Sequence, residues 1–124
     1  MKRKGFTLVE VLIVVIIIGI LAAIGIPQFA ASIEKAKGGE ARAGLGHIQT
    51  GEKVYFAENE FYTEEIDELD ITLSEKYWNF EIEVTGANST EYLATANRIG
   101  GTHANQTLTM NEAGTIGGNW DYNK

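Results

Sequence analysis

The sequence of 124 residues contains no cysteine, and this absence excludes several kinds of structure and chemistry. No disulfide can stabilise the fold, and neither thiol catalysis nor a thiolate metal site is available. Small domains often need a staple or an assembly partner, because their hydrophobic core is small. The length predicts a single domain whose stability comes from packing and, where packing falls short, from association.

Basic residues are also scarce, since 10 lysines and arginines face 17 acids and the formal net charge is −7. Three of the ten are Lys2, Arg3 and Lys4, so a chain without its first five residues has 7 basic residues against 17 acids, a net charge of −10. A surface this acidic repels phosphate backbones. We therefore expect no direct nucleic-acid binding.

Residue patterns typical of catalysis are missing as well. His47 and His103 are far apart in the sequence, and no spacing of acids and histidines is typical of a metal site. There is no GxSxG motif, P-loop or dinucleotide fingerprint. The acid-rich residues 58–70 are more typical of a solvated surface than of a calcium site. We expect that the chain is not an enzyme and that it needs no cofactor and no metal.

One long hydrophobic run contrasts with this polar composition. Residues 6–26 contain a single charged residue, Glu10. A helix of about 20 apolar residues crosses a bilayer, and in lipid a helix satisfies all of its own backbone groups. The three basic residues before the run predict a cytoplasmic N-terminus, with the rest of the chain on the other side of the membrane.

Glu10 helps to choose among the interpretations of this run. A cleaved secretory signal peptide has an apolar stretch of about 7–15 residues, which is shorter than this one. A plain one-pass anchor explains the length but not the carboxylate, because an acid in an apolar span costs a few kcal/mol. Since a lone acid there is more often functional or paired, the plain anchor is disfavoured.

The start of the chain resembles a known family of precursors. Residues 4–10 read KGFTLVE and are similar to the class III signal of type IV prepilins and pseudopilins. The leader is short and basic and ends in Gly5, the next residue is Phe6, and the fifth residue after the glycine is Glu10. The resemblance continues through Pro27 and covers about the first 30 residues closely.

This resemblance implies a route from a membrane precursor to a filament. A prepilin peptidase would cut between Gly5 and Phe6 and would N-methylate Phe6. The subunit would wait in the inner membrane, meet the assembly platform there, and polymerise with other pilin subunits into an extracellular pilus. In the filament, the Glu10 carboxylate would pair with the Phe6 amine of a neighbouring subunit. Such a pair compensates two buried charges and sets the register between subunits.

Gly19 and Pro27 are the candidate positions of a break in the helix. Proline lacks an N–H and clashes with the carbonyl four residues earlier. In assembled pili of the family, the stretch between such a glycine and proline can lose its helical form, and the resemblance extends this to residues 19–27. A simple proline kink is the alternative, and the residues do not decide between the two.

The whole pattern predicts an α+β fold. Residues 1–5 are the leader, and a long helix is expected over 6–57, with a membrane-spanning part at 6–26. Apolar residues recur at mostly helical spacing in 28–57 and are expected on a face half buried under a sheet: Phe29, Ile33, Ala36, Ala41, Leu45, Ile48 and Tyr55. Glycines in this part indicate either a bend or close packing.

A connecting loop and a sheet are expected after the helix. Residues 58–76 connect the two, with Thr63 as the N-cap of a short helix. Residues 77–124 alternate in the manner of a small antiparallel sheet of three to four strands.

The predicted function is that of a structural subunit of a type IV pilus, with adhesion, motility and DNA uptake as outputs of the whole filament. A pseudopilin of a type II secretion system is the alternative, because its N-terminus would look the same. The sequence shows no ligand run like the calcium site that major pseudopilins often carry near the C-terminus. A membrane-tethered enzyme or solute-binding domain finds no supporting residues.

Overall fold

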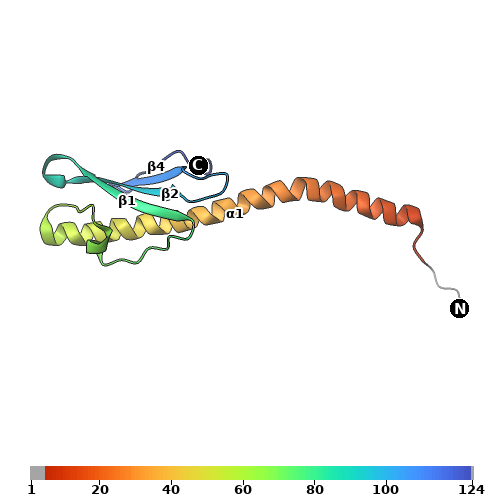
Figure 1. Ribbon diagram of the computed structural model, residues 1–124, viewed down its shortest axis with the longest axis horizontal. Helices are drawn as coiled ribbons and strands as arrows, with labels where there is room; N and C mark the ends of the chain where they lie inside the picture. The colour runs from red at the N-terminus through yellow and green to blue at the C-terminus, as the bar shows by residue number, and fades with distance from the viewer. Residues whose placement is uncertain (1–4, 124) are drawn as a thin grey trace. The chain divides into compact units, whose positions relative to one another are not determined.

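The structure is a computed structural model that describes residues 5–123 (Figure 1). The chain falls into two compact units, Met1–Glu34 and Lys35–Lys124, and the second is called the head below. One helix, α1 (Leu8–Asn59), contributes residues to both units. It begins and ends two residues later than the predicted range of 6–57. At its C-terminal end, Glu60 takes a positive φ of 66°, which stops the helix.

The N-terminal unit consists of the first part of α1. Pro27 lies inside the helix, and residues on both sides of it are helical. The residues from Gly19 to Pro27 are therefore helical in the isolated chain. The predicted break concerned the assembled filament and stays a prediction. This helix is long and apolar enough to cross a membrane, with a mean hydropathy of 3.1 in its most apolar window.

The head contains one antiparallel sheet of four strands, which confirms the predicted α+β class. Its strands are β1 (Trp78–Thr85), β2 (Glu91–Arg98), β3 (Thr107–Asn111) and β4 (Ile116–Gly117), in the order β1-β2-β3-β4. Phe80 pairs with Ala96 and Ile82 with Ala94, so apolar side chains of neighbouring strands share one face. Side chains of β1 alternate between buried and exposed, as a half-buried strand requires.

The buried face of the sheet packs on residues 35–59 of α1, and the sheet runs alongside this part of the helix in Figure 1. Glycines make the approach close. A Cβ atom on Gly38 would lie 2.1 Å from the ring of Trp120, and one on Gly44 would lie 2.2 Å from the ring of Phe80. The helix continues through Gly38 and Gly39. Of the two explanations for these glycines, the structure therefore supports close packing.

The expected apolar stripe of α1 is confirmed where the sheet covers the helix, because Ala41, Leu45 and Ile48 are fully buried and Tyr55 packs against the core. The expectation was wrong for Phe29, Ile33 and Ala36, which are exposed; the first two lie in the N-terminal unit, before the head begins.

One further expectation was wrong. Thr63 is not the N-cap of the short helix η1 (Ile66–Leu69), whose N-cap is Glu65. The Thr63 hydroxyl instead accepts a hydrogen bond from the N–H of Glu65, the N-cap residue itself, at 3.1 Å.

Candidate functional site

Thr7 and Glu10 together form the start of α1. The Glu10 carboxylate accepts a hydrogen bond from the Thr7 N–H at 2.9 Å, and the Thr7 hydroxyl accepts one from the Glu10 N–H at 3.1 Å. This reciprocal pair is a capping box, which satisfies two backbone donors that a helix leaves free at its first turn. The pattern Thr-x-x-Glu is visible in the sequence, but a capping box was not predicted there because Glu10 was interpreted only as a charge.

Gly5 and Phe6 precede the helix in a non-helical, exposed segment. The Phe6 side chain is 87% exposed. A shallow groove is lined by Phe6, Glu10, Val11, Val14 and Val15, so the structure brings two of the predicted assembly residues together. A Cβ atom on Gly5 would meet nothing within 4 Å. No packing within this unit requires glycine there, and a requirement for it must come from an outside partner.

The Glu10 carboxylate keeps acceptor capacity beyond the capping bond. A carboxylate can accept about four hydrogen bonds, and the bond from Thr7 uses one of its oxygens. If the chain is cut after Gly5, the new amine of Phe6 stands one residue before Thr7. The Glu10 carboxylate can therefore attract a nearby cation, whether that cation belongs to the same chain or to a neighbouring chain.

The helix that follows exposes an apolar surface along its length. Large side chains between residues 8 and 26 are 48–75% exposed, and the most apolar window of the helix is 0% buried. An exposed apolar surface of this extent marks an interaction with a membrane or with other proteins. The arrangement can therefore insert into lipid or pack against equivalent helices, and it offers no chemistry of its own.

The head buries one carboxylate, which sequence reasoning did not single out. Glu52 is fully buried on α1, and one of its oxygens accepts a hydrogen bond from the Thr63 N–H at 3.1 Å. Burial raises the pKa of Glu52 to about 7, although the bond from Thr63 acts in the opposite direction. Its other oxygen and the hydroxyl of Tyr92 are buried without a partner among residues 5–123. Burial also raises the pKa of Tyr92.

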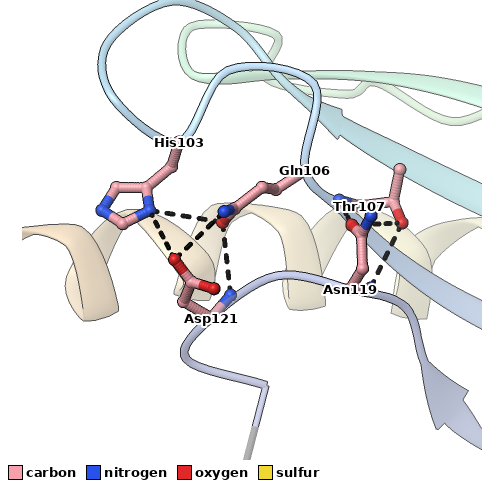
Figure 2. Close-up of polar contacts among 5 residues, drawn as sticks. All are labelled: His103, Gln106, Thr107, Asn119 and Asp121. Atoms are coloured by element: carbon pink, nitrogen blue, oxygen red, sulfur yellow. Dashed lines mark hydrogen bonds and ion pairs between the residues drawn. The ribbon is translucent and has the colours of Figure 1, made fainter.

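Polar contacts hold the C-terminal segment against the loop before β3 (Figure 2). The Gln106 amide donates to Asp121 at 3.0 Å, and the Asp121 N–H donates back to Gln106 at 3.2 Å. His103 lies 3.3 Å from the same Asp121 carboxylate. The side-chain oxygen of Asn119 accepts a bond from the Thr107 N–H at 2.7 Å. These contacts take the place of a covalent closure, which a chain without cysteine cannot make.

Four basic side chains of the head lie over aromatic rings. Lys35, Lys37, Arg42 and Lys76 lie over the rings of Tyr77, Trp120 and Tyr122, at 4.7–5.9 Å from the ring centroids. Arg98 also lies near Tyr77 and Trp78, but it is buried and donates to backbone carbonyls of Tyr77 and Ile99. Within residues 5–123, no group of three or more His, Asp or Glu residues could hold a metal ion.

Comparisons with known families add to this geometry. A family described as "Prokaryotic N-terminal methylation motif" matches residues 1–26. A family described as "Type IV minor pilin ComP, DNA uptake sequence receptor" matches residues 27–110. The second description stands against our expectation that the chain does not bind nucleic acid, which rested on the net charge alone.

Curated relatives point in the same direction. The chain is 34% identical to the type IV wide pilus major component of Thermus thermophilus, over 82% of this chain and 78% of that protein. It is 43% identical to the type IV major pilin protein of Myxococcus xanthus, over 55% of this chain. It is 33% identical to the type II secretion system core protein G of Escherichia coli, over 49% of this chain and 42% of that protein. The chain spans about a third (31%) of the Myxococcus protein.

Proposed function

This chain belongs to the type IV pilin family, whose members are structural and non-enzymatic, and on that premise we propose that it is a structural subunit of a type IV pilus. The subunit is cut between Gly5 and Phe6, methylated at Phe6, and assembled through the first part of α1. As a precursor it lies in the inner membrane with its N-terminus in the cytoplasm. Its partners are the prepilin peptidase, the assembly platform and other pilin subunits.

The observation that carries this proposal is the position of Glu10. It is the single charge in residues 6–26, and it stands at the capped start of a helix whose apolar side chains are exposed. In lipid such a carboxylate is costly, and the bond from the Thr7 N–H compensates it in part. A neighbouring subunit's Phe6 amine compensates it further, which favours the filament over the membrane.

The proposal is tested by mass spectrometry of surface filaments sheared from the native host. The expected subunit begins at Phe6 and carries one methyl group on its amine. A mature chain that still begins at Met1, or the failure to recover any filament that contains it, would contradict the proposal. A Gly5→Val precursor is the control for cleavage, because a larger residue before the cut is expected to block the peptidase and leave the leader attached.

The place where the filament forms distinguishes a pilus subunit from the alternative, a pseudopilin of a secretion system. Similarity to a secretion-system core protein covers 49% of this chain, whereas the wide-pilus component matches 82%. A pilus subunit is expected on long surface filaments at native expression, and its deletion is expected to leave protein secretion unchanged. A secretion defect in the deletion strain, with no loss of surface filaments, would favour the pseudopilin.

A second candidate function, DNA binding by a minor pilin, is favoured by one observation, the family match over residues 27–110. Its test is fluorescence anisotropy of labelled duplex DNA with the full chain in detergent micelles. Binding through phosphates is expected to strengthen steeply as the salt concentration falls. Equal binding of a scrambled duplex would indicate backbone contacts alone, and no binding at low salt would remove this candidate.

A further inference from the structure

Strand β1 lies at one edge of the sheet, because the strand order is β1-β2-β3-β4. Its pairing with β2 decides which of its backbone groups point outward. The Ile99 N–H donates to the Tyr77 carbonyl at 2.8 Å, and backbone groups alternate along a strand, so the odd-numbered residues of β1 bond to β2. The even-numbered residues, among them Phe80 and Ile82, therefore direct their N–H and C=O groups away from the sheet. Another strand can pair with an edge of this kind.

The segment that follows α1 covers only part of this edge. Glu64 accepts a hydrogen bond at 3.1 Å from the N–H of Val84, which confirms that the even-numbered groups point outward. A groove beside this bond is lined by Glu64, Glu65, Ile66, Asp67, Phe80, Glu81 and Ile82, and we call it the β1 edge groove. The side chains of Phe80 and Ile82 belong to the core, so these two residues reach the groove through their backbone. Within residues 5–123, the N–H groups of Phe80 and Ile82 have no hydrogen-bond partner on this side of the strand.

The groove is acidic, and no basic residue interrupts it. Its acids are Glu64, Glu65, Asp67 and Glu81, and all four are exposed. No lysine or arginine occurs in residues 54–75 or 77–97, which supply the whole lining. In the part of the chain that the structure describes, no lysine or arginine forms an ion pair with any of the four. The groove therefore joins unpaired backbone groups to negative charge that the head itself does not neutralise.

We propose that the β1 edge groove binds an extended peptide segment with basic side chains, which adds a strand beside β1. Main-chain hydrogen bonds to Phe80 and Ile82 provide the attachment. Alternate side chains of an extended segment point to the same face, so lysine or arginine at every second position can meet the groove acids. The whole interface lies within the head.

Charge decides which extended segment fits. A second copy of β1 would bring Glu81 and Glu83 of one chain close to the same acids of the other, and like charges on neighbouring strands are unfavourable. The acids also repel nucleic acid at this groove. The one run of consecutive basic residues in the chain is Lys2 to Lys4, in the leader. On the proposed function the leader lies on the cytoplasmic side of the membrane, and this is the only step that rests on that function. The occupant is therefore a segment of another protein.

Binding is measured by fluorescence anisotropy of a labelled peptide with the full chain in neutral detergent micelles. The probe alternates lysine and threonine over the eight-residue length of β1. The same peptide with glutamate in place of lysine is expected not to bind. The lysine peptide methylated at its backbone nitrogens is expected to bind about tenfold more weakly, because it keeps its charge but cannot donate main-chain hydrogen bonds. If the lysine peptide does not bind, or if the methylated peptide binds equally well, the proposal is wrong.

Hydrogen exchange shows where the peptide lies on the sheet. In the free chain, the amides of Phe80 and Ile82 are expected to exchange faster than those of the neighbouring odd-numbered residues, which bond to β2. A saturating amount of the lysine peptide is expected to slow exchange of these two amides about tenfold. Binding without this protection would overturn the proposal. Protection that grows with protein concentration in the absence of peptide would assign the groove to a second copy and would overturn the proposal as well.

The decisive variant removes three negative charges from the groove, and a matched control removes three from exposed acids outside it. The groove variant carries Glu65→Gln, Asp67→Asn and Glu81→Gln, and the control variant carries Glu58→Gln, Asp70→Asn and Glu75→Gln. Each exposed ion pair contributes about twofold, so the groove variant is expected to bind the lysine peptide about tenfold more weakly. The control variant is expected to bind as the wild type does.

Equal weakening in the two variants would show a response to net charge alone, and the proposal would fail. Should the groove variant not fold, the exchange measurement on the wild type decides. These experiments need no filament, so their failure leaves the proposed pilus function intact. A missing methyl group on Phe6 would likewise leave the peptide result intact.

Discussion

The two units of the chain differ in the exposure of their apolar residues. The head buries a cluster of 13 hydrophobic residues between α1 and the sheet, and its glycines bring the two layers close together. The N-terminal unit leaves its large apolar side chains 41–87% exposed. The head therefore carries its stabilising contacts within itself, whereas the N-terminal unit needs lipid or other helices. Mutations are expected to separate accordingly into effects on folding and effects on assembly.

Glu10→Val is expected to have the largest effect, and to affect assembly without affecting the head. Removing one partner of a buried ion pair costs about 3–5 kcal/mol, so filament yield should fall on the order of a hundredfold or more. The stability of the head should not change, because Glu10 lies in the other unit. Filaments are counted by electron microscopy, and Glu58→Val is the control for loss of an exposed acid. Normal filament yield from Glu10→Val would refute the pairing role.

Gly44→Ala should destabilise the head without affecting membrane insertion. Its Cβ atom would lie 2.2 Å from the ring of Phe80, and overpacking of this kind costs about 1–3 kcal/mol. Gly46→Ala is the matched control two residues away, where a Cβ atom meets nothing within 4 Å. The control should stabilise by up to about 1 kcal/mol through helix propensity. Urea unfolding of the full chain in micelles, followed by tryptophan fluorescence, measures both variants.

Glu52 should make the stability of the head depend on pH. Its folded pKa of about 7 is above the ordinary value of 4.5, so the folded state binds a proton more tightly than the unfolded chain. The stabilising contribution is therefore complete below about pH 4.5 and is lost as the pH rises through 7. Glu52→Gln should flatten this dependence and add on the order of 1–3 kcal/mol at pH 8. An equal pH dependence in the variant and the wild type would contradict the assignment.

Thr7→Ala should have the smallest effect, and it is confined to the start of the helix. Loss of an N-cap hydroxyl costs about 1 kcal/mol, which corresponds to roughly fivefold faster hydrogen exchange of the amides in the first turn. Thr7→Ser should keep the capping bond and exchange at the wild-type rate. Exchange is measured in micelles by nuclear magnetic resonance. Unchanged protection in Thr7→Ala would show that Glu10 holds the first turn without it.

The sequence was most informative where one residue had no ordinary explanation. A single acid in 21 apolar residues and the spacing of Gly5, Phe6 and Glu10 identified the family, and the family matches confirm it. The cleavage, the methylation and the pairing of Glu10 remain predictions, because they depend on an enzyme and on neighbouring subunits. The capping box was present in the sequence but was not predicted, because Glu10 was interpreted only as the lone charge and it also caps the helix.

The sequence predicted the fold class of the head but not all of its packing. Alternation in β1 fixed which side chains of that strand face the core, and four strands confirm the expected sheet. The buried stripe of α1 was predicted correctly at Ala41, Leu45 and Ile48 but was extended too far toward the N-terminus. The role of Gly38 and Gly44, which receive the rings of Trp120 and Phe80, was not assigned because glycine carries no hydrophobic signal. The expectation against nucleic acid rested on the net charge alone, and the description of the family that matches residues 27–110 stands against it.

The closure of the C-terminal segment in Figure 2 has a mechanical consequence. Asn119 and Asp121 hold this segment through hydrogen bonds, and Trp120 seats beside them above Gly38. If tension on a filament pulled the C-terminal segment away from the head, no covalent bond would break. The same donors and acceptors can pair again once the load is removed, without an oxidant or an isomerase. The C-terminal segment can therefore open and close reversibly.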